Sequence, residues 1–383
     1  MRLDLPIVQL AVLALAAWIA SRTLLRPAPS PTAAGAIVMA VGIFGLASFR
    51  KIQAIPASAA QPFALGLLVV WGFIAASYAA SRLQGRLAAH IAAPVDAFAV
   101  GTWVAGTAVM ARLLLQGVPG WRGAALALGL AAFALWLWYL ALVLRGFRAM
   151  LASPARLRAT GRILLSAVST QSLALLAWHL WPNAGFLRAP VTALIVLGYL
   201  FYGAGLVLIV QRYMREPRWT LSEDWDNTNC ILHGAMSISG LAVAYTGLLP
   251  EVAGIGTWLY VLASLLVVET IEVARMIRRV RQHGLQRGLF TYHVSQWSRN
   301  FTFGMFYAFT LALAPAFVAS PALSPLAPFV AWLLGSGPYI VLFFLLIELG
   351  LWACANVKFG TAVSRPPSPI VNESMSNLEE QRN

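Results

Sequence analysis

The feature that most constrains this chain is a series of apolar segments, each about as long as a bilayer is thick. A helix needs about 20 predominantly apolar residues to cross the hydrocarbon core. Eleven segments of the sequence meet this requirement: residues 5–24, 33–49, 60–82, 93–116, 121–145, 161–181, 187–211, 229–249, 253–274, 297–318 and 326–354. Charged residues make up only 10% of the chain, against about 25% in soluble domains. The sequence therefore predicts an all-α, polytopic membrane protein.

The segments divide the chain into three parts. Residues 1–30 form an extra N-terminal hydrophobic helix, which we expect to span the membrane because it has no polar face. Residues 31–355 form a ten-helix body. Residues 356–383 are rich in Pro and Ser and polar, which is typical of a disordered tail.

The basic residues gather in a few short loops, which indicates the orientation of the chain. Arginines crowd the loops 145–162, 212–218 and 275–287, whereas the loops near 250 and 320 hold one acid and no base. The positive-inside rule puts the arginine-rich loops in the cytoplasm. We therefore expect an inner (plasma) membrane protein with a cytoplasmic C-terminus and an external N-terminus. The bilayer, and no nucleic acid, is the expected partner of this basic chain, because no soluble basic face exists.

The helices of the body are expected to be of two kinds. Segments 33–49, 93–116, 161–181, 229–249 and 297–318 are richer in Gly, Ser, Thr and Asn than their neighbours. Polar side chains at membrane depth usually face a bundle interior or a water-filled cavity. We therefore predict five inner helices around a central pore and five outer helices. A solid bundle, in which the small residues serve close packing, is the alternative.

The side chains predicted to line this pore are small, hydroxylic or aromatic. On segment 297–318, Asn300, Phe303, Tyr307 and Thr310 share one helical face. Hydroxyl and amide groups without acids suit a partly dehydrated anion. The full set of expected pore-lining residues is Gly42, Gly101, Thr102, Gly106, Ser166, Ser169, Thr170, His233, Ser237, Gly240, Asn300, Gly304 and Tyr307.

Five stretches, in this order, resemble the odd-numbered helices of a known family. They are "PTAAGAIVMAVGIFGLA", "GTWVAGTAVMARLL", "LLSAVSTQSLALLAW", "HGAMSISGLA" and "WSRNFTFGMFYAF". The family is the tellurite-resistance/dicarboxylate transporters, which includes plant guard-cell slow anion channels and fungal malate and sulfite permeases. The resemblance covers roughly residues 31–355 and implies ten helices, a homotrimer and a pore closed by Phe303, with Gly304 bending the helix. The chain departs from the family at Ser166 and Gly234, where relatives carry proline, and in the extra segment 5–24.

The expected function is that of a passive channel or permease for small inorganic or organic anions, gated by Phe303. A proton-coupled exporter of a small acid or oxyanion, of the malate, sulfite or tellurite type, is the alternative. Glu348, deep in the last segment, is the candidate for proton coupling, because acids within the membrane are commonly functional.

A membrane-embedded enzyme is the third hypothesis. The sequence has no HExxH, CxxC or GxSxG motif, and Cys230 and Cys354 lack the spacing of a metal site. Glu269 and Glu272 lie beside Arg275 and Arg278, with Glu272 and Arg275 at helical spacing, which predicts an ion pair at the membrane interface. We therefore expect no enzyme activity, no cofactor and no metal.

Overall fold

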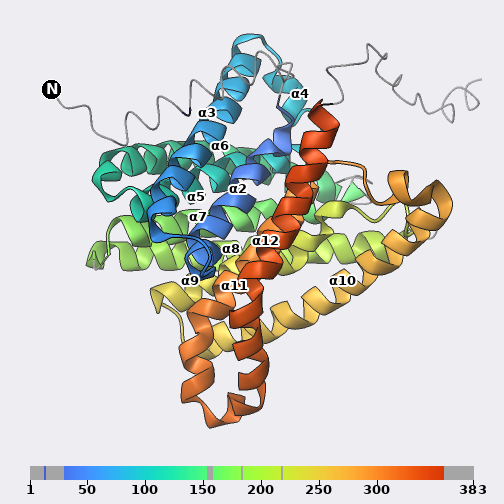
Figure 1. Ribbon diagram of the computed structural model, residues 1–383. Helices are drawn as coiled ribbons and strands as arrows, with labels where there is room; N and C mark the ends of the chain where they lie inside the picture. Colours follow the sequence, from blue (N-terminus) through green and yellow to red (C-terminus); the bar gives the residue numbers. More distant parts are fainter. Residues whose placement is uncertain (1–12, 14–29, 153–157, 183, 217–218, 358–383) are drawn as a thin grey trace, which may run out of the picture.

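The computed structural model describes residue 13 and residues 30–152, 158–182, 184–216 and 219–357. These residues form helices, turns and bends, with no β-strand among them. Nine helices within the described ranges are long and apolar enough to cross a membrane. The chain is thus an all-helical, multi-pass membrane protein, as the sequence predicts (Figure 1).

The helices are numbered along the chain. In order they are α2 (Gly35–Ile43), α3 (Ala60–Leu83), α4 (Leu87–Ile91), α5 (Gly101–Gly117), α6 (Arg122–Ala152), α7 (Leu165–Leu180), α8 (Arg188–Arg215), α9 (Ile231–Thr246), α10 (Glu251–Gly288), α11 (Gln296–Ala319) and α12 (Ala327–Val357). Short 3₁₀ turns precede α5, α7 and α9, namely Asp96–Val100, Gly161–Leu164 and Asn227–Cys230.

Every predicted segment from 33–49 onward contains one of these helices. Segment 229–249 forms α9, which is not among the nine that qualify by length and hydropathy. Helix α10 continues to Gly288, well past the predicted end at 274, and its backbone leaves helical angles at Gly284 (φ 76°). Segment 5–24, apart from Leu13, and the tail after Val357 lie outside the described residues.

Buried and exposed helices alternate along the chain. The most apolar windows of the spans that contain α2, α5, α7 and α11 are 67–94% buried, whereas those of α3, α6, α8, α10 and α12 are 28–39% buried. Most residues of α9 are buried as well. The buried helices are the ones rich in glycine and hydroxyl residues, because small side chains let helix backbones approach closely.

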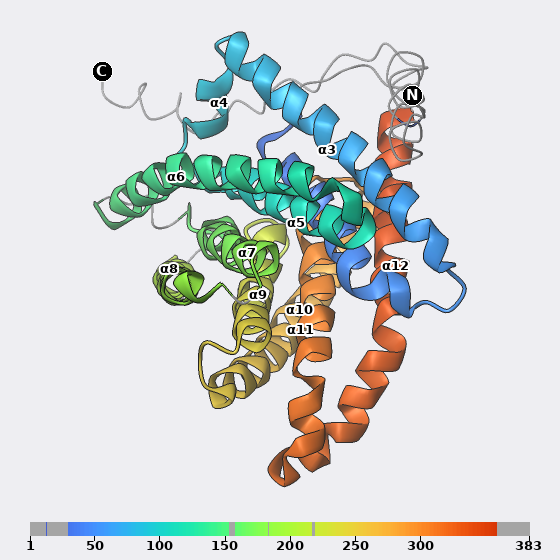
Figure 2. The same cartoon turned by 90° about the vertical axis from the view of Figure 1, so that its left-hand side faces the viewer.

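The five buried helices contact one another in cyclic order. Helix α2 packs on α5, α5 on α7, α7 on α9, α9 on α11, and α11 again on α2. We call this arrangement the inner ring. Each outer helix packs on a member of the ring, as α6 does on α5 and α12 on α11 (Figure 2).

Helix α2 ends in an irregular turn that the sequence did not predict. Residues Phe44–Ser48 form a π-helical turn, followed by the 3₁₀ turn Phe49–Lys51. π-Turns of this kind are rare and often found at functional sites. Here the turn carries Leu46 and Ala47, which line a cavity between the helices of the inner ring.

Candidate functional site

A cavity of about 240 Å³ lies where the five helices of the inner ring meet. We call it the ring cavity. Each helix of the ring contributes to its wall, α2 together with its terminal π-turn. The lining residues are Ile43, Leu46, Ala47, Arg112, Leu115, Gln116, His179, Leu241, Tyr245 and Ala308. The cavity lies toward the ends of α5, α7 and α9 that are opposite the arginine-rich loops, because Gln116, His179 and Tyr245 are near the last residues of those helices.

The ring cavity contains one fixed cation, Arg112 of α5. The Nε atom of Arg112 is fully enclosed and has no hydrogen-bond partner within the described residues. None of the ion pairs between described residues involves Arg112. The Arg112 side chain as a whole is partly buried. A partly buried guanidinium without a carboxylate has an uncompensated positive charge, which an anion in the cavity could balance.

His179 of α7 lies beside this guanidinium. Its Nδ1 is 2.7 Å from the carbonyl oxygen of Leu175, and a carbonyl can only accept, so Nδ1 carries the proton. Nε2 of the neutral ring is then an acceptor, and Nη2 of Arg112 donates to it over 3.3 Å. The histidine is therefore held in one tautomer by its own helix and presents a lone pair to Arg112.

Tyr245 of α9 completes the surroundings of the guanidinium. Its ring centroid is 5.9 Å from Cζ of Arg112 and 5.3 Å from the ring of His179. At the first distance the face of the tyrosine attracts the cation. Arg112 is thus fixed by two neutral rings, and these leave its charge uncompensated.

None of the residues predicted to line the pore is in the wall of the ring cavity. None of Arg112, His179 and Tyr245 was assigned to the pore from the sequence. One signal was available, because Arg112 is the one charged residue between Asp96 and Arg122. Its direction into the ring depends on the rotation of α5, which the sequence does not give.

The predicted serine and threonine residues are buried and donate their hydroxyl protons to nearby backbone carbonyls, whereas the buried hydroxyl of Tyr307 has no partner among the described residues. Thr170 of α7, for example, donates to the carbonyl of Ser166 and accepts from the indole of Trp136. The other donations run from Thr102 to Ala99, Ser166 to Ile163, Ser169 to Ser166 and Ser237 to His233. Each of these serine and threonine hydroxyls would have to rotate before it could donate to a ligand.

The predicted glycines lie at close contacts between helices. A Cβ atom at Gly304 would lie 2.6 Å from Cγ2 of Ile43, and one at Gly106 would lie 3.0 Å from the carbonyl oxygen of Gly35. Gly42 faces Val109, Gly101 faces Tyr139, and Gly240 faces the ring of Phe309. These five glycines permit neighbouring helices to touch. Helix α11 is one continuous helix through Gly304.

The predicted face of α11 contacts helices on three sides. Phe303 stacks on His233 of α9 with ring centroids 6.2 Å apart, and its centroid is 5.1 Å from that of Phe344 of α12. Farther along the face, Tyr307 packs against Gly337 of α12 and Thr310 accepts a hydrogen bond from Trp258 of α10. Asn300 is buried on the same face.

His233 belongs to a charged cluster at the arginine-rich end of the ring. The ring of His233 is fully buried, with Nε2 at 3.6 Å from Oε1 of Glu269. Glu269 and Glu272 each pair with Arg299 of α11, at 3.5 and 3.0 Å, and Glu272 also pairs with Arg275 at 3.5 Å. The predicted ion pair between Glu272 and Arg275 is therefore present, and Arg299 joins it from a second helix.

His293 lies in the turn before α11, close to the same cluster. The backbone N–H of Ser295 donates to its Nδ1 over 3.2 Å, so the imidazole is neutral. Burial lowers the pKa of His293, and the nearby Arg162 lowers it further, against an opposing effect of Asp226.

Glu348 of α12 stands apart from both groups of residues. It is 4% exposed, and its Oε1 atom has no hydrogen-bond partner within the described residues. The described part of the chain holds no group of three His, Cys, Asp or Glu residues that could bind a metal ion.

Comparison with known proteins adds no relative. No family model matches the chain, and no curated protein matches it. The function of the chain must therefore be inferred from its own residues.

Proposed function

We propose that this protein carries small anions across the membrane along the inner ring, and that Arg112 is the site that attracts them. The observation that carries the proposal is the uncompensated guanidinium in a cavity that all five helices line. A charged side chain within a membrane-spanning helix is rare and commonly faces a pathway for substrate or ions.

The chemistry of the cavity favours an anion over a cation. Among the described residues that line it, Arg112 is the one charged side chain and none is a carboxylate. A planar guanidinium pairs well with oxyanions and carboxylates, because it can donate two parallel hydrogen bonds. Halides, nitrate and small carboxylates are therefore the substrate classes to be tested.

The orientation of the pathway and its gate are proposed from the resemblance to the tellurite-resistance/dicarboxylate transporters. We propose that the arginine-rich end is cytoplasmic, that the protein is in the plasma membrane, and that Phe303 closes the pathway on that side of the ring cavity. The contacts of the Phe303 ring with His233 and Phe344 support this proposal, because they would hold the ring in one position. The resemblance also implies a trimer of such pathways, without enzyme activity.

The test is anion flux into proteoliposomes for the wild type and Arg112→Gln. Loss of a hydrogen bond to a charged group costs about 1.5–3 kcal/mol, which corresponds to about tenfold to hundredfold weaker anion binding. Arg188→Gln is the matched control, because Arg188 is exposed near the same end of the ring and outside its cavity. Equal concentration dependence of flux in all three proteins would refute the proposal.

A second candidate, proton-coupled transport, is favoured by the tautomer of His179. Protonation of Nε2 would end its hydrogen bond from Arg112 and bring two positive groups together. An anion between them would stabilise the protonated state, so anion and proton binding would favour each other. The charged and titratable groups that face His179 across the cavity are Arg112 and Tyr245.

The two candidates differ in what a proton gradient does. In coupled transport, an imposed gradient drives wild-type anion flux, and His179→Gln abolishes this drive while anion binding persists. In a channel, the gradient has no effect beyond its electrical potential. The same two proteins, compared at clamped potential, distinguish the mechanisms.

A further inference from the structure

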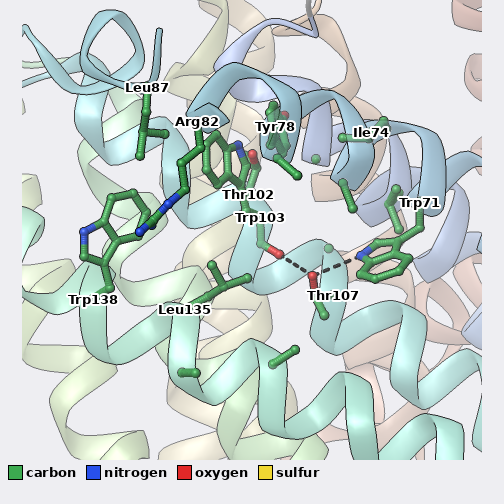
Figure 3. Close-up of a pocket in the computed structure, with 17 residues that line it drawn as sticks. Trp71, Ile74, Tyr78, Arg82, Leu87, Thr102, Trp103, Thr107, Leu135 and Trp138 are labelled. Carbon is green, nitrogen blue, oxygen red and sulfur yellow. Dashed lines mark hydrogen bonds between the residues drawn. The ribbon is translucent and has the colours of Figure 1, made fainter. Parts of the chain in front are cut away.

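A second and larger cavity, of about 500 Å³, opens between the outer helices α3 and α6, with α5 behind it (Figure 3). We call it the α3–α6 groove. The most apolar windows of α3 and α6 are each only 33% buried, so the groove lies on the bilayer side of the molecule. Its volume is within the range of pockets that bind small molecules.

The groove is an apolar slot with aromatic walls. Trp71, Tyr78, Trp103 and Trp138 form the walls, and the small side chains of Ala75, Ala131 and Ala134 leave the space between them.

The polar atoms along most of the groove are already paired within the protein. Thr107 accepts from Trp71 over 3.0 Å (dashed line in Figure 3). Tyr78 donates to Pro31, and Trp103 donates to Thr32. This part of the groove therefore suits a hydrocarbon.

Two donors at one end of the groove have no partner in the part of the chain that the structure describes. They are the guanidinium of Arg82 and the indole N–H of Trp138, which form no hydrogen bond or ion pair with any described residue. Figure 3 shows the side chain of Arg82 extended toward Trp138. The nearest acid along the chain, Asp96, is paired with Arg162, and no other acid occurs from residue 97 to residue 215. This end of the groove is therefore cationic.

The length of the groove matches one leaflet of a bilayer. From Trp71 to Arg82 the groove follows α3 for eleven residues, which is about 16 Å at 1.5 Å per residue. Half of a hydrocarbon core of about 30 Å is about 15 Å. Arg82 is next to the last residue of α3, on the side of the arginine-rich loops, so its guanidinium is at the depth of the lipid headgroups.

We propose that the α3–α6 groove binds one anionic phospholipid from the leaflet on the arginine-rich side. An acyl chain lies between the tryptophans, and the phosphate accepts hydrogen bonds from Arg82 and Trp138. Arginine suits this role because its planar guanidinium can hold two phosphate oxygens at once. The site is separate from the ring cavity, and the proposal does not depend on anion transport.

Native mass spectrometry of the full chain, with phosphatidylglycerol or phosphatidylcholine of equal chain length, tests the proposal. Arg82→Gln is expected to weaken binding of phosphatidylglycerol about fivefold, which is the effect of one arginine near the headgroups, and to leave phosphatidylcholine unchanged. Ala75→Phe is expected to reduce binding of both lipids, because the ring fills the space of the acyl chain.

Each variant has a matched control. Arg86→Gln removes an exposed arginine outside the groove, and Ala76→Phe adds a ring on the exposed side of the same helix. Equal effects of Arg82→Gln and Arg86→Gln on phosphatidylglycerol would overturn the proposal, as would equal effects of Ala75→Phe and Ala76→Phe. Two further results would overturn it by showing another occupant. If Ala75→Phe dissociates an oligomer and leaves lipid binding intact, the occupant is a second copy of the chain. If deletion of residues 1–24 increases the amount of bound lipid, the occupant is the N-terminal segment.

Discussion

The stability of the variant Gly240→Ala tests whether this glycine of the inner ring faces a lumen or a neighbouring helix. A Cβ atom at this position would lie 2.8 Å from Cε2 of Phe309 and still closer to Cε1 and Cζ. Phe309 is fully buried, so its ring cannot turn away into a free space. We therefore expect α9 and α11 to be forced apart by the added methyl group.

The size of the effect is set by two opposing contributions. Overpacking of a buried contact costs about 1–3 kcal/mol, and three overlapping ring atoms favour the upper part of that range. Replacement of glycine by alanine within a helix returns at most about 1 kcal/mol. The expected net loss of folding free energy is about 2 kcal/mol, which lowers the unfolding midpoint by a few degrees.

Thermal unfolding of the purified protein in detergent measures this loss. Gly72→Ala on α3 is the control, because no atom lies within 4 Å of its added Cβ. The double variant Gly240→Ala/Phe309→Leu should recover part of the loss, since a smaller partner makes room for the methyl group. If Gly240→Ala is as stable as Gly72→Ala, the contact with Phe309 is not a constraint and the reasoning fails.

Three further changes test other parts of the molecule. Phe303→Ala is expected to raise the flux of chloride, nitrate or malate in proteoliposomes, because removal of the ring opens the proposed pathway. Arg299→Gln should lower the stability measured by thermal unfolding by about 1–3 kcal/mol, less than the 3–5 kcal/mol typical of a fully buried pair, since the Arg299 side chain is 34% exposed. The lowered pKa of His293 means that the unfolded chain binds its proton first, so unfolding midpoints should fall as the pH decreases below about 6.5. His293→Gln should weaken that dependence.

Each of these changes has its own control. Phe343→Ala removes an exposed ring of α12 and should leave flux unchanged. Arg287→Gln removes an exposed arginine that forms none of the described ion pairs, and it should leave stability unchanged. Unchanged flux in Phe303→Ala, a wild-type midpoint in Arg299→Gln, or the same pH dependence in His293→Gln would contradict the respective prediction.

The course of the helices could be predicted from the sequence because the bilayer fixes their length. The bounds of segments such as 60–82 and 297–318 were predicted from the length of their apolar runs alone. They match the bounds of α3 and α11 within a few residues. The small and hydroxylic composition of segments such as 161–181 also marks the buried helices, since bulky side chains would hold helix backbones apart.

The direction of individual side chains could not be predicted in the same way. Thr310 and Tyr307 share a helical face with Phe303, but Thr310 packs on α10 and Tyr307 on α12, whereas Phe303 also contacts His233 of α9. A rotation of about 100° per residue separates one face from the next, so a helix of known length still leaves its faces unassigned. The π-turn after Ile43 has the same effect, because it shifts Leu46 and Ala47 relative to a regular helix.

The charges of the inner ring differ between its two ends, and this difference determines what a variant of Arg112 can reveal. At the arginine-rich end Arg162, Arg275 and Arg299 pair with carboxylates, whereas Arg112 pairs with none in the described residues. If the protein carries anions as proposed, a passing anion would be held at Arg112. A channel needs binding that is favourable enough for entry and weak enough for exit, so Arg112→Gln in a channel should raise the anion concentration at half-maximal flux while flux at high concentration persists. A coupled transporter must bind its anion before each conformational change. In such a transporter, Arg112→Gln should therefore abolish transport at every anion concentration that is too low to fill the weakened site.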